Sequence, residues 1–430
     1  MNDEAKCVFS QAYTEGSSWS AYESIDKVFV GGTQLLDDDS NPNGNNHFRG
    51  DFMFGCQTQE SGLFVTQLAD GIMGMSNHPM TYPQVMYDQG KLEHNMFSLC
   101  FRRELHVSKR GIVAGRITLG GIDTRADHAP MVYAKNVATN GWFTVFVKSI
   151  YIRHNGGQNA KADVGMDQKV QKLDVDVYEI NSGKGVIIDS GTTDTYLHAS
   201  IAKQFELAWD TATEGRWKFS NDRSIALDGD ELLRLPTILI QMAAYGEFAL
   251  PNEKLAGLSG EGVDPDSPQD VILAIPASHY MEYAAPTGGA GGVGQGKGTY
   301  TPRIYFTEKQ GSVIGANAMQ AHNVLFDREH GRIGFAESSC EYHEESLALP
   351  GEGGGVMSVD CSLGAPSLSV SCSESADLSR CKRMGTNPDT TFDGLEIWSR
   401  IVQAPGMPQG LTCEEVSIKQ NEVSRIKRDG

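Results

Sequence analysis

The chain has 430 residues, with 55 acidic and 36 basic side chains and a net charge of −19 at pH 7. At roughly 100–200 residues per domain, this length predicts two or three domains. The hydrophobic fraction of 40% and the charged fraction of 21% are typical of a globular protein with a sizeable core. The negative charge argues against nucleic acid as a partner, because phosphate binding needs clustered Lys and Arg.

The sequence shows neither a recognisable targeting signal nor a recognisable membrane-spanning segment. The first residues, 1–7, have neither the basic region nor the apolar region of a signal peptide. No apolar run approaches the roughly 18–20 residues that span a bilayer, so we expect no membrane span.

The eight cysteines include no C-x-x-C pair, which argues against a zinc ribbon or a thioredoxin-type site. An even number of cysteines fits disulfides in an oxidising compartment, and it also fits a set of free buried thiols.

Short β-branched and aromatic runs bounded by Gly, Asn and Asp predict a mainly β protein from Cys7 to about Phe335. The most regular of these runs are 27–30, 116–119, 142–147 and 185–188. The clearest helical periodicity covers 200–209. The residues that we expect on its buried face are Ile201, Phe205, Leu207 and Ala208.

After Cys340 the composition changes, and residues 346–430 are rich in Ser and Gly. This tail holds four cysteines, Cys361, Cys372, Cys381 and Cys413. We expect it to be partly disordered or held together by its own cysteines.

The segment 289–294 satisfies the pattern G-x-G-x-x-G, but the residues that follow it, 299–306, predict a strand. A dinucleotide site requires a helix at that place. The histidines show no spacing suited to metal ligands and no H-E-x-x-H motif occurs. We therefore expect no cofactor and no metal.

One segment, 185–193 (GVIIDSGTT), combines an apolar strand with a polar turn. Asp189 is expected at the exit of a buried strand. Gly191 permits a turn that a side chain would crowd, while Ser190 and Thr192 can donate hydrogen bonds near the carboxylate. The tripeptide alone is also a common start of a β-turn.

The pattern apolar-apolar-Asp-Ser-Gly-Thr-Thr is the active-site signature of the pepsin-like aspartic peptidases, and other landmarks of that family follow in its order. Residues 12–19 resemble the flap hairpin, with Tyr13 in place of the flap tyrosine. Residues 323–336 resemble the closing strands. The apolar-Gly segments beside the two active-site loops have counterparts in Ile72, Gly74, Ile314 and Gly315. The resemblance covers about residues 5–340.

This resemblance implies a mainly β, bilobal pepsin-like fold. Residues 1–150 would be the remainder of the N-terminal lobe, 151–345 the C-terminal lobe, and 346–430 an added tail. It also implies an aspartic endopeptidase that hydrolyses proteins or peptides, without a cofactor, as a monomer in the secretory or endomembrane system or outside the cell.

The resemblance further assigns roles to particular residues. Asp189 would activate the attacking water, Thr192 would orient its carboxylate, Ser190 would brace hydrogen bonds between the lobes, and Tyr13 would close over the substrate. The sequence around the flap resembles that of plant, protist and algal members of the family, such as the nepenthesin and plasmepsin V groups. By this resemblance, Cys7 and Cys56 would form a disulfide beside the flap. The partners of Cys100 and Cys340 stay unassigned.

The sequence departs from the family at one essential point. Hydrolysis in this family uses two aspartates that share a proton, and the first should precede the flap tyrosine by several tens of residues. Tyr13 is only twelve residues from the start, and no second D-T-G or D-S-G occurs.

Two interpretations follow from this departure. In the first, the chain is a truncated form of an active peptidase, which explains at once the missing aspartate, propeptide and signal peptide. In the second, it is a non-catalytic pepsin-fold protein that binds or inhibits other proteins. We favour the first, because Asp189-Ser-Gly-Thr-Thr193 is intact.

Overall fold

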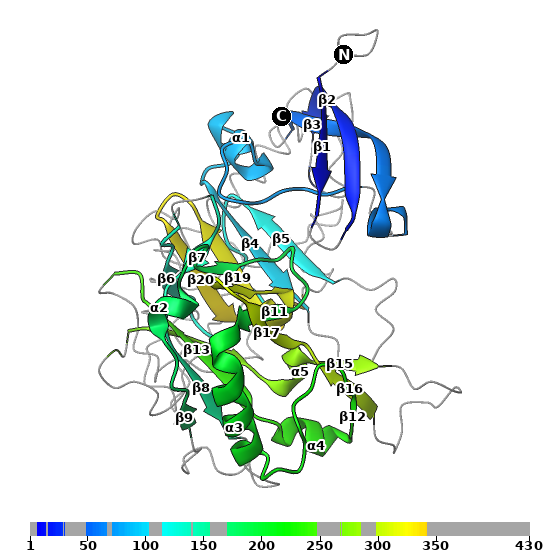
Figure 1. Cartoon of the computed structure of the whole chain (residues 1–430). Helices are drawn as coiled ribbons and strands as arrows, with labels where there is room; N and C mark the ends of the chain where they lie inside the picture. Colours follow the sequence, from blue (N-terminus) through cyan, green and yellow to red (C-terminus); the bar gives the residue numbers. More distant parts are fainter. Residues whose placement is uncertain are drawn as a thin grey trace, which may run out of the picture. The chain divides into compact units, whose positions relative to one another are not determined.

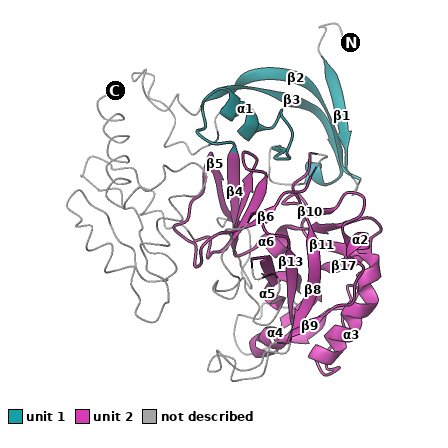
Figure 2. Cartoon of the chain, turned by 90° about the vertical axis from the view of Figure 1, so that its left-hand side faces the viewer, with its two compact units in different colours: residues 1–95, 421–430 teal, residues 96–420 magenta. Residues whose placement is uncertain are grey.

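The computed structural model describes residues 7–13, 16–28, 30, 49–66, 71–102, 114–138, 141–154, 170–246, 267, 269–284 and 298–341. The predicted tail 346–430 and the Gly-rich segment 289–294 lie outside these residues. The described part is mainly β, as predicted. It divides into two compact units between Asn95 and Met96 (Figure 2).

The first unit is built on a three-stranded antiparallel sheet (Figure 1). Its strands are β1 (Val8–Ala12), β2 (Ser18–Val28) and β3 (Gly50–Ser61), in that spatial order. A 3₁₀ turn, η3 (Gly62–Val65), and a short helix, α1 (Tyr82–Asp88), follow. The rings of Phe52 on β3 and Tyr82 on α1 meet edge to face at 5.3 Å, which ties the helix to the sheet.

The expected disulfide between Cys7 and Cys56 is wrong in this structure, where both residues are free thiols. Cys7 lies opposite Glu23 on β2, and Cys56 lies opposite Tyr22 on the same strand. β2 therefore separates the two cysteines by two strand spacings, about 9–10 Å, and the alternation of side chains puts them on opposite faces. A disulfide requires Cα atoms within about 7 Å.

The second unit contains a five-stranded antiparallel sheet that joins distant parts of the chain (Figure 1). Its spatial order is β5 (Gly115–Leu119), β4 (Met96–Phe101), β19 (His322–Asp327), β20 (Arg332–Glu337) and β6 (Val132–Lys135). A disulfide between Cys100 and Cys340, with Cα atoms 5.4 Å apart, links the same two regions.

The division into compact units falls at residue 95, and the lobe boundary of 150 that the sequence suggested stays a prediction. β4 pairs with β19 and β6 pairs with β20, so β4 and β6 belong to the second compact unit.

A second five-stranded sheet carries the Asp-Ser-Gly segment. Its spatial order is β17 (Ile304–Glu308), β11 (Thr195–His198), β18 (Ser312–Ile314), β10 (Val186–Ile188) and β7 (Thr144–Val145). The pairs β10–β18 and β11–β17 are parallel, and β11 runs antiparallel to β18. The predicted strand at 185–188 is thus confirmed.

The described residues of this unit also form two smaller sheets. One has the order β14 (Val271–Ile275), β13 (Thr237–Met242), β8 (Val147–Arg153) and β9 (Val170–Lys172). The other has the order β12 (Ile225–Leu227), β16 (Gly298–Pro302) and β15 (Met281–Ala284). The short helices are α2 (Val177–Ile180), η4 (Ala199–Ile201), α4 (Gly229–Arg234), α5 (Ala277–Tyr280) and α6 (Ala316–Met319).

The predicted helix at 200–209 is present as η4 followed by α3 (Ala202–Ala212), which packs against β8. Phe205 and Ala208 are buried as expected, but Leu207 is 54% exposed. At 100° per residue, Leu207 lies 200° around the helix from Phe205, whereas Trp209 lies only 40° from it. Trp209 is accordingly the fully buried residue, and its indole N–H donates to the carbonyl of Trp217 at 2.6 Å.

Candidate active site

Asp189 stands at the exit of β10, the place that the sequence predicted. The three residues of β10 are buried and Asp189 itself is partly exposed. The backbone N–H of Asp189 donates to the carbonyl of Ile314 at 3.0 Å, and that of Ile188 donates to the carbonyl of Phe143 at 2.9 Å. Hydrogen bonds to chain segments on both sides therefore hold Asp189 in place directly after the C-terminal end of β10.

Each oxygen of the Asp189 carboxylate accepts one hydrogen bond from its own loop. The backbone N–H of Gly191 donates to Oδ1 at 2.8 Å, and the hydroxyl of Thr192 donates to Oδ2 at 2.7 Å. The expected Thr192 contact is confirmed. The second donor in the described structure is the amide of Gly191 and not the hydroxyl of Ser190, because the turn points the amide at the carboxylate.

The loop leaves little room for a side chain at Gly191. A Cβ atom at this position would lie 3.1 Å from Oδ1 of Asp189, which is tighter than an ordinary van der Waals contact. A side chain at this position would press against the Asp189 carboxylate, so glycine suits the turn.

Ile314 and Gly315 lie directly beside this loop. Ile314 is fully buried on β18, and Gly315 follows it. A Cβ atom on Gly315 would collide with the carbonyl oxygens of Asp194 and Thr192. The loop and β18 can approach this closely only because residue 315 is glycine.

Two backbone hydrogen bonds close the contact between the loop and the residues after β18. The N–H of Ala316 donates to the carbonyl of Thr192 at 2.7 Å, and the N–H of Asn317 donates to the carbonyl of Thr193 at 3.0 Å. The first two residues of α6 therefore hold the loop at Thr192 and Thr193.

Sequence reasoning missed the residues that hold the end of the loop. The hydroxyl of Thr195 accepts from the N–H of Gly315 at 3.2 Å and donates to Oδ1 of Asn317 at 2.7 Å. Arg303 forms an ion pair with Asp194. Asn317 and Arg303 lie more than 100 residues further along the chain and belong to no local motif, so no signal in the sequence could place them here.

Tyr13 lies in the turn between β1 and β2 of the first unit, which confirms the hairpin predicted at 12–19. Its N–H donates to the carbonyl of Ser17 at 2.9 Å, and Gly16 closes the turn with φ of +95°. The Tyr13 hydroxyl accepts from the indole N–H of Trp19 at 3.1 Å, and its ring meets Phe64 at 5.3 Å. The Tyr13 side chain thus contacts both its own hairpin and η3 of the same unit.

Ile72 and Gly74 do not repeat the arrangement of Ile314 and Gly315 within the first unit. They lie in an irregular stretch, and Ile72 is 58% exposed. Among the residues described around them, no atom lies close to the position of a Cβ on Gly74. Their role beside an active-site loop stays a prediction.

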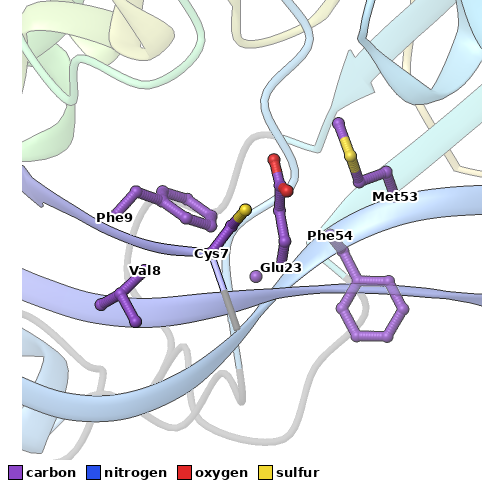
Figure 3. A pocket seen from close by; sticks show the side chains of 7 residues that line it. Cys7, Val8, Phe9, Glu23, Met53 and Phe54 are labelled. Atoms are coloured by element: carbon purple, nitrogen blue, oxygen red, sulfur yellow. The ribbon is translucent and has the colours of Figure 1, made fainter. Parts of the chain in front are cut away.

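The first unit also carries an open pocket of about 450 Å³ on its sheet. Figure 3 shows the side chains of Cys7, Glu23 and Met53 on one side of the ribbon, and those of Val8 and Phe54 on the other. Neither Tyr13 nor Asp189 contributes to its lining.

With this geometry in view, comparison with known proteins decides the family. The model of a family described as eukaryotic aspartyl protease matches residues 49–262, a range that includes the whole Asp189 loop. This region belongs to the eukaryotic aspartyl proteases. The pepsin-like resemblance inferred from the motifs is thereby confirmed.

A curated relative of this aspartyl protease region is Aspartic protease 5 of Toxoplasma gondii. The two are 35% identical over 130 residues, which is 29% of this chain and 12% of the relative. The match thus spans about an eighth of that protein's length. Among the helices that the structure describes, none is long and apolar enough to cross a membrane.

Proposed function

We propose that this protein is an aspartic endopeptidase in which Asp189 is a catalytic carboxylate. One observation carries the proposal: within a region of the aspartyl protease family, Asp189 emerges from a buried strand with Gly191 N–H on one carboxylate oxygen and Thr192 O–H on the other. Such donors fix the orientation of the carboxylate, and its partly exposed position leaves it accessible to a water molecule and a substrate.

The chemistry needs a second carboxylate. Two carboxyl groups close together share one proton, so that one accepts the proton of the attacking water while the other donates toward the scissile carbonyl oxygen. These 430 residues contain a single D-S/T-G motif. In our proposal, the dyad is completed by a matching Asp-Ser/Thr-Gly loop that this sequence does not include, and the chain is a truncated form of the whole peptidase.

The remaining roles follow the same proposal. Tyr13, at the turn of its hairpin, covers an extended peptide substrate, and Ser190 braces the contact between the lobes. The whole protein acts as a monomer in the secretory or endomembrane system or outside the cell, and it needs no cofactor.

The test begins with the transcript, read upstream of the codon for Met1. We expect an in-frame extension that encodes an apolar-Asp-Thr/Ser-Gly segment. The extended protein should cleave a denatured protein at acidic pH, and Asp189→Asn should abolish cleavage. Asp210→Asn, at an exposed position on α3, is the matched control and should retain activity. Undiminished cleavage by the Asp189→Asn variant would overturn the proposal.

A second candidate function is a non-catalytic pepsin-fold protein that binds or inhibits another protein. The single D-S/T-G motif favours it. A stop codon directly upstream of Met1, together with stable capture of an intact partner by the purified chain, would place this function ahead of hydrolysis.

A further inference from the structure

Asp194 and Arg303 form a two-point ion pair at the far end of the Asp189 loop. Nη2 of Arg303 lies 2.9 Å from Oδ2 of Asp194, and Nε lies 3.2 Å from Oδ1. The Asp194 side chain is only 8% exposed, against 32% for Arg303. Paired hydrogen bonds of this kind between a guanidinium and a carboxylate set direction as well as distance.

Arg303 is itself held in place from several sides. Its N–H donates to the carbonyl of Tyr280 at 2.7 Å, and its own carbonyl accepts from Nδ2 of Asn317 at 2.9 Å. Glu282 on β15 adds a second carboxylate, 3.2 Å from Nε. The guanidinium therefore projects from a fixed backbone toward Asp194.

The connection from Asp194 back to Asp189 is short. Asp194 follows Thr193, whose carbonyl accepts from the N–H of Asn317. The carbonyl of Asp194 lies directly against Gly315. The loop thus has two fixed ends, one where Asp189 pairs with Ile314 and one where Asp194 pairs with Arg303.

Arg303 supplies the counter-charge for the buried Asp194 carboxylate at the outgoing end of the loop. Burial raises the pKa of Asp194, and the adjacent Arg303 opposes that rise. Without the guanidinium, a buried carboxylate would lose its counter-charge and would be driven to protonate or to move toward water. Movement of Asp194 would pull on the loop five residues after Asp189.

We propose that Arg303 is a positioning residue for Asp189, acting through its ion pair with Asp194, which clamps the outgoing end of the Asp-Ser-Gly-Thr-Thr loop. This inference rests on the proposed peptidase function for its catalytic consequence. The clamp itself can be measured without any activity.

The first experiment is hydrogen exchange followed by mass spectrometry on the 430-residue chain, comparing Arg303→Gln with the wild type. The peptides of interest contain residues 186–195 and 312–319, since Ala316 and Asn317 donate their amides to the loop. We expect exchange there to quicken by roughly tenfold, the effect of losing a charge-assisted pair, while the remaining peptides change little.

The control is Arg216→Gln, which removes an exposed pair with Glu214 elsewhere in the same unit and should leave loop exchange unchanged. Asp194→Asn should reproduce the effect of Arg303→Gln, and the double variant should add nothing further. Arg303→Lys keeps the charge without the two-point geometry, so the loop should exchange at a rate between those of the wild type and Arg303→Gln. This variant replaces Arg303→Gln in the experiment if the glutamine variant fails to fold. Unchanged loop exchange in Arg303→Gln or Arg303→Lys would overturn the proposal.

The second experiment measures the extended peptidase. Arg303→Gln should lower kcat by roughly tenfold and leave KM within about twofold, because the carboxylate is misplaced and the substrate contacts are kept. Faster loop exchange with an unchanged kcat would refute the positioning role. Failure of the proposed function would give a different result: the extended wild-type protein would show no cleavage that Asp189→Asn abolishes.

Discussion

Thr192 is hydrogen-bonded to Asp189 through its side chain and to the first residue of α6 through its backbone. Its hydroxyl donates to Oδ2 of the carboxylate at 2.7 Å, and its carbonyl accepts from the N–H of Ala316, also at 2.7 Å. The residue that orients the carboxylate is thus fixed by the segment after β18. The direction of the Asp189 side chain is therefore set by the tertiary structure as well as by its own turn.

The first prediction concerns this hydroxyl. Thr192→Val removes the hydroxyl group and keeps the shape, so the Asp189 carboxylate should lose one of its two loop donors. We expect kcat of the extended peptidase to fall by roughly tenfold or more, in line with the loss of a hydrogen bond to a charged group. Thr192→Ser keeps the hydroxyl and should retain most activity. Equal kcat values for the valine and serine variants would contradict the assigned role.

The second prediction concerns the close approach at Gly315. Gly315→Ala should destabilise the second unit by about 2 kcal/mol or more, because the new methyl group meets the carbonyl oxygens of Asp194 and Thr192. Gly229→Ala is the control, since a Cβ there enters open space at the first turn of α4, and it should be neutral or slightly stabilising. Denaturant unfolding measures both, and a small effect at Gly315 would show that the loop can shift.

The third prediction concerns the disulfide between Cys100 and Cys340, which are 240 residues apart. A crosslink that closes so long a loop restricts the unfolded chain, so Cys100→Ser should cost roughly 3–5 kcal/mol. Thermal melts with and without a reducing agent should show the same difference. The double variant Cys7→Ser, Cys56→Ser removes the two free thiols of the first unit and should melt like the wild type. Loss of stability in that double variant would indicate that these thiols are bonded in solution.

The fourth prediction is a pH dependence at Asp127. Burial of its carboxyl group raises the pKa from 3.8 to about 8, although Asn323 donates hydrogen bonds to it. The folded state therefore retains a proton that the unfolded state releases. Its contribution to stability is fully present below pH 3.8 and is lost as the pH rises toward 8.

Asp127→Asn should remove this dependence. At pH 8 the variant should be more stable than the wild type, by on the order of 2 kcal/mol, and the difference should shrink toward pH 4. Only the difference between variant and wild type isolates Asp127, because burial also lowers the pKa of His322, to about 4. Denaturant unfolding curves at several pH values measure this difference in stability, with Asp210→Asn as the control at an exposed position. A difference that is the same at pH 4 and pH 8 would contradict the assignment.

Much of the site was predictable from local sequence because its causes are local. The apolar run 186–188 followed by Asp-Ser-Gly places Asp189 at a strand exit. The Thr192 hydroxyl and the Gly191 amide lie within three residues of the carboxylate that they bind. The hairpin around Tyr13 and the helix at 202–212 follow in the same way from short-range patterns.

The tertiary structure alone decided what supports the site. Arg303, Asn317 and the Cys100–Cys340 link meet their partners across more than 100 residues of chain, and such pairings depend on strand order and not on neighbouring residues. The same holds for Cys7 and Cys56, whose separation by β2 is a property of the sheet. Sequence by itself thus determined the chemistry of the Asp189 loop, because the hydrogen-bond donors to the carboxylate lie within three residues of it. The fold determined what holds that loop in position, because only sheet pairing brings distant residues together.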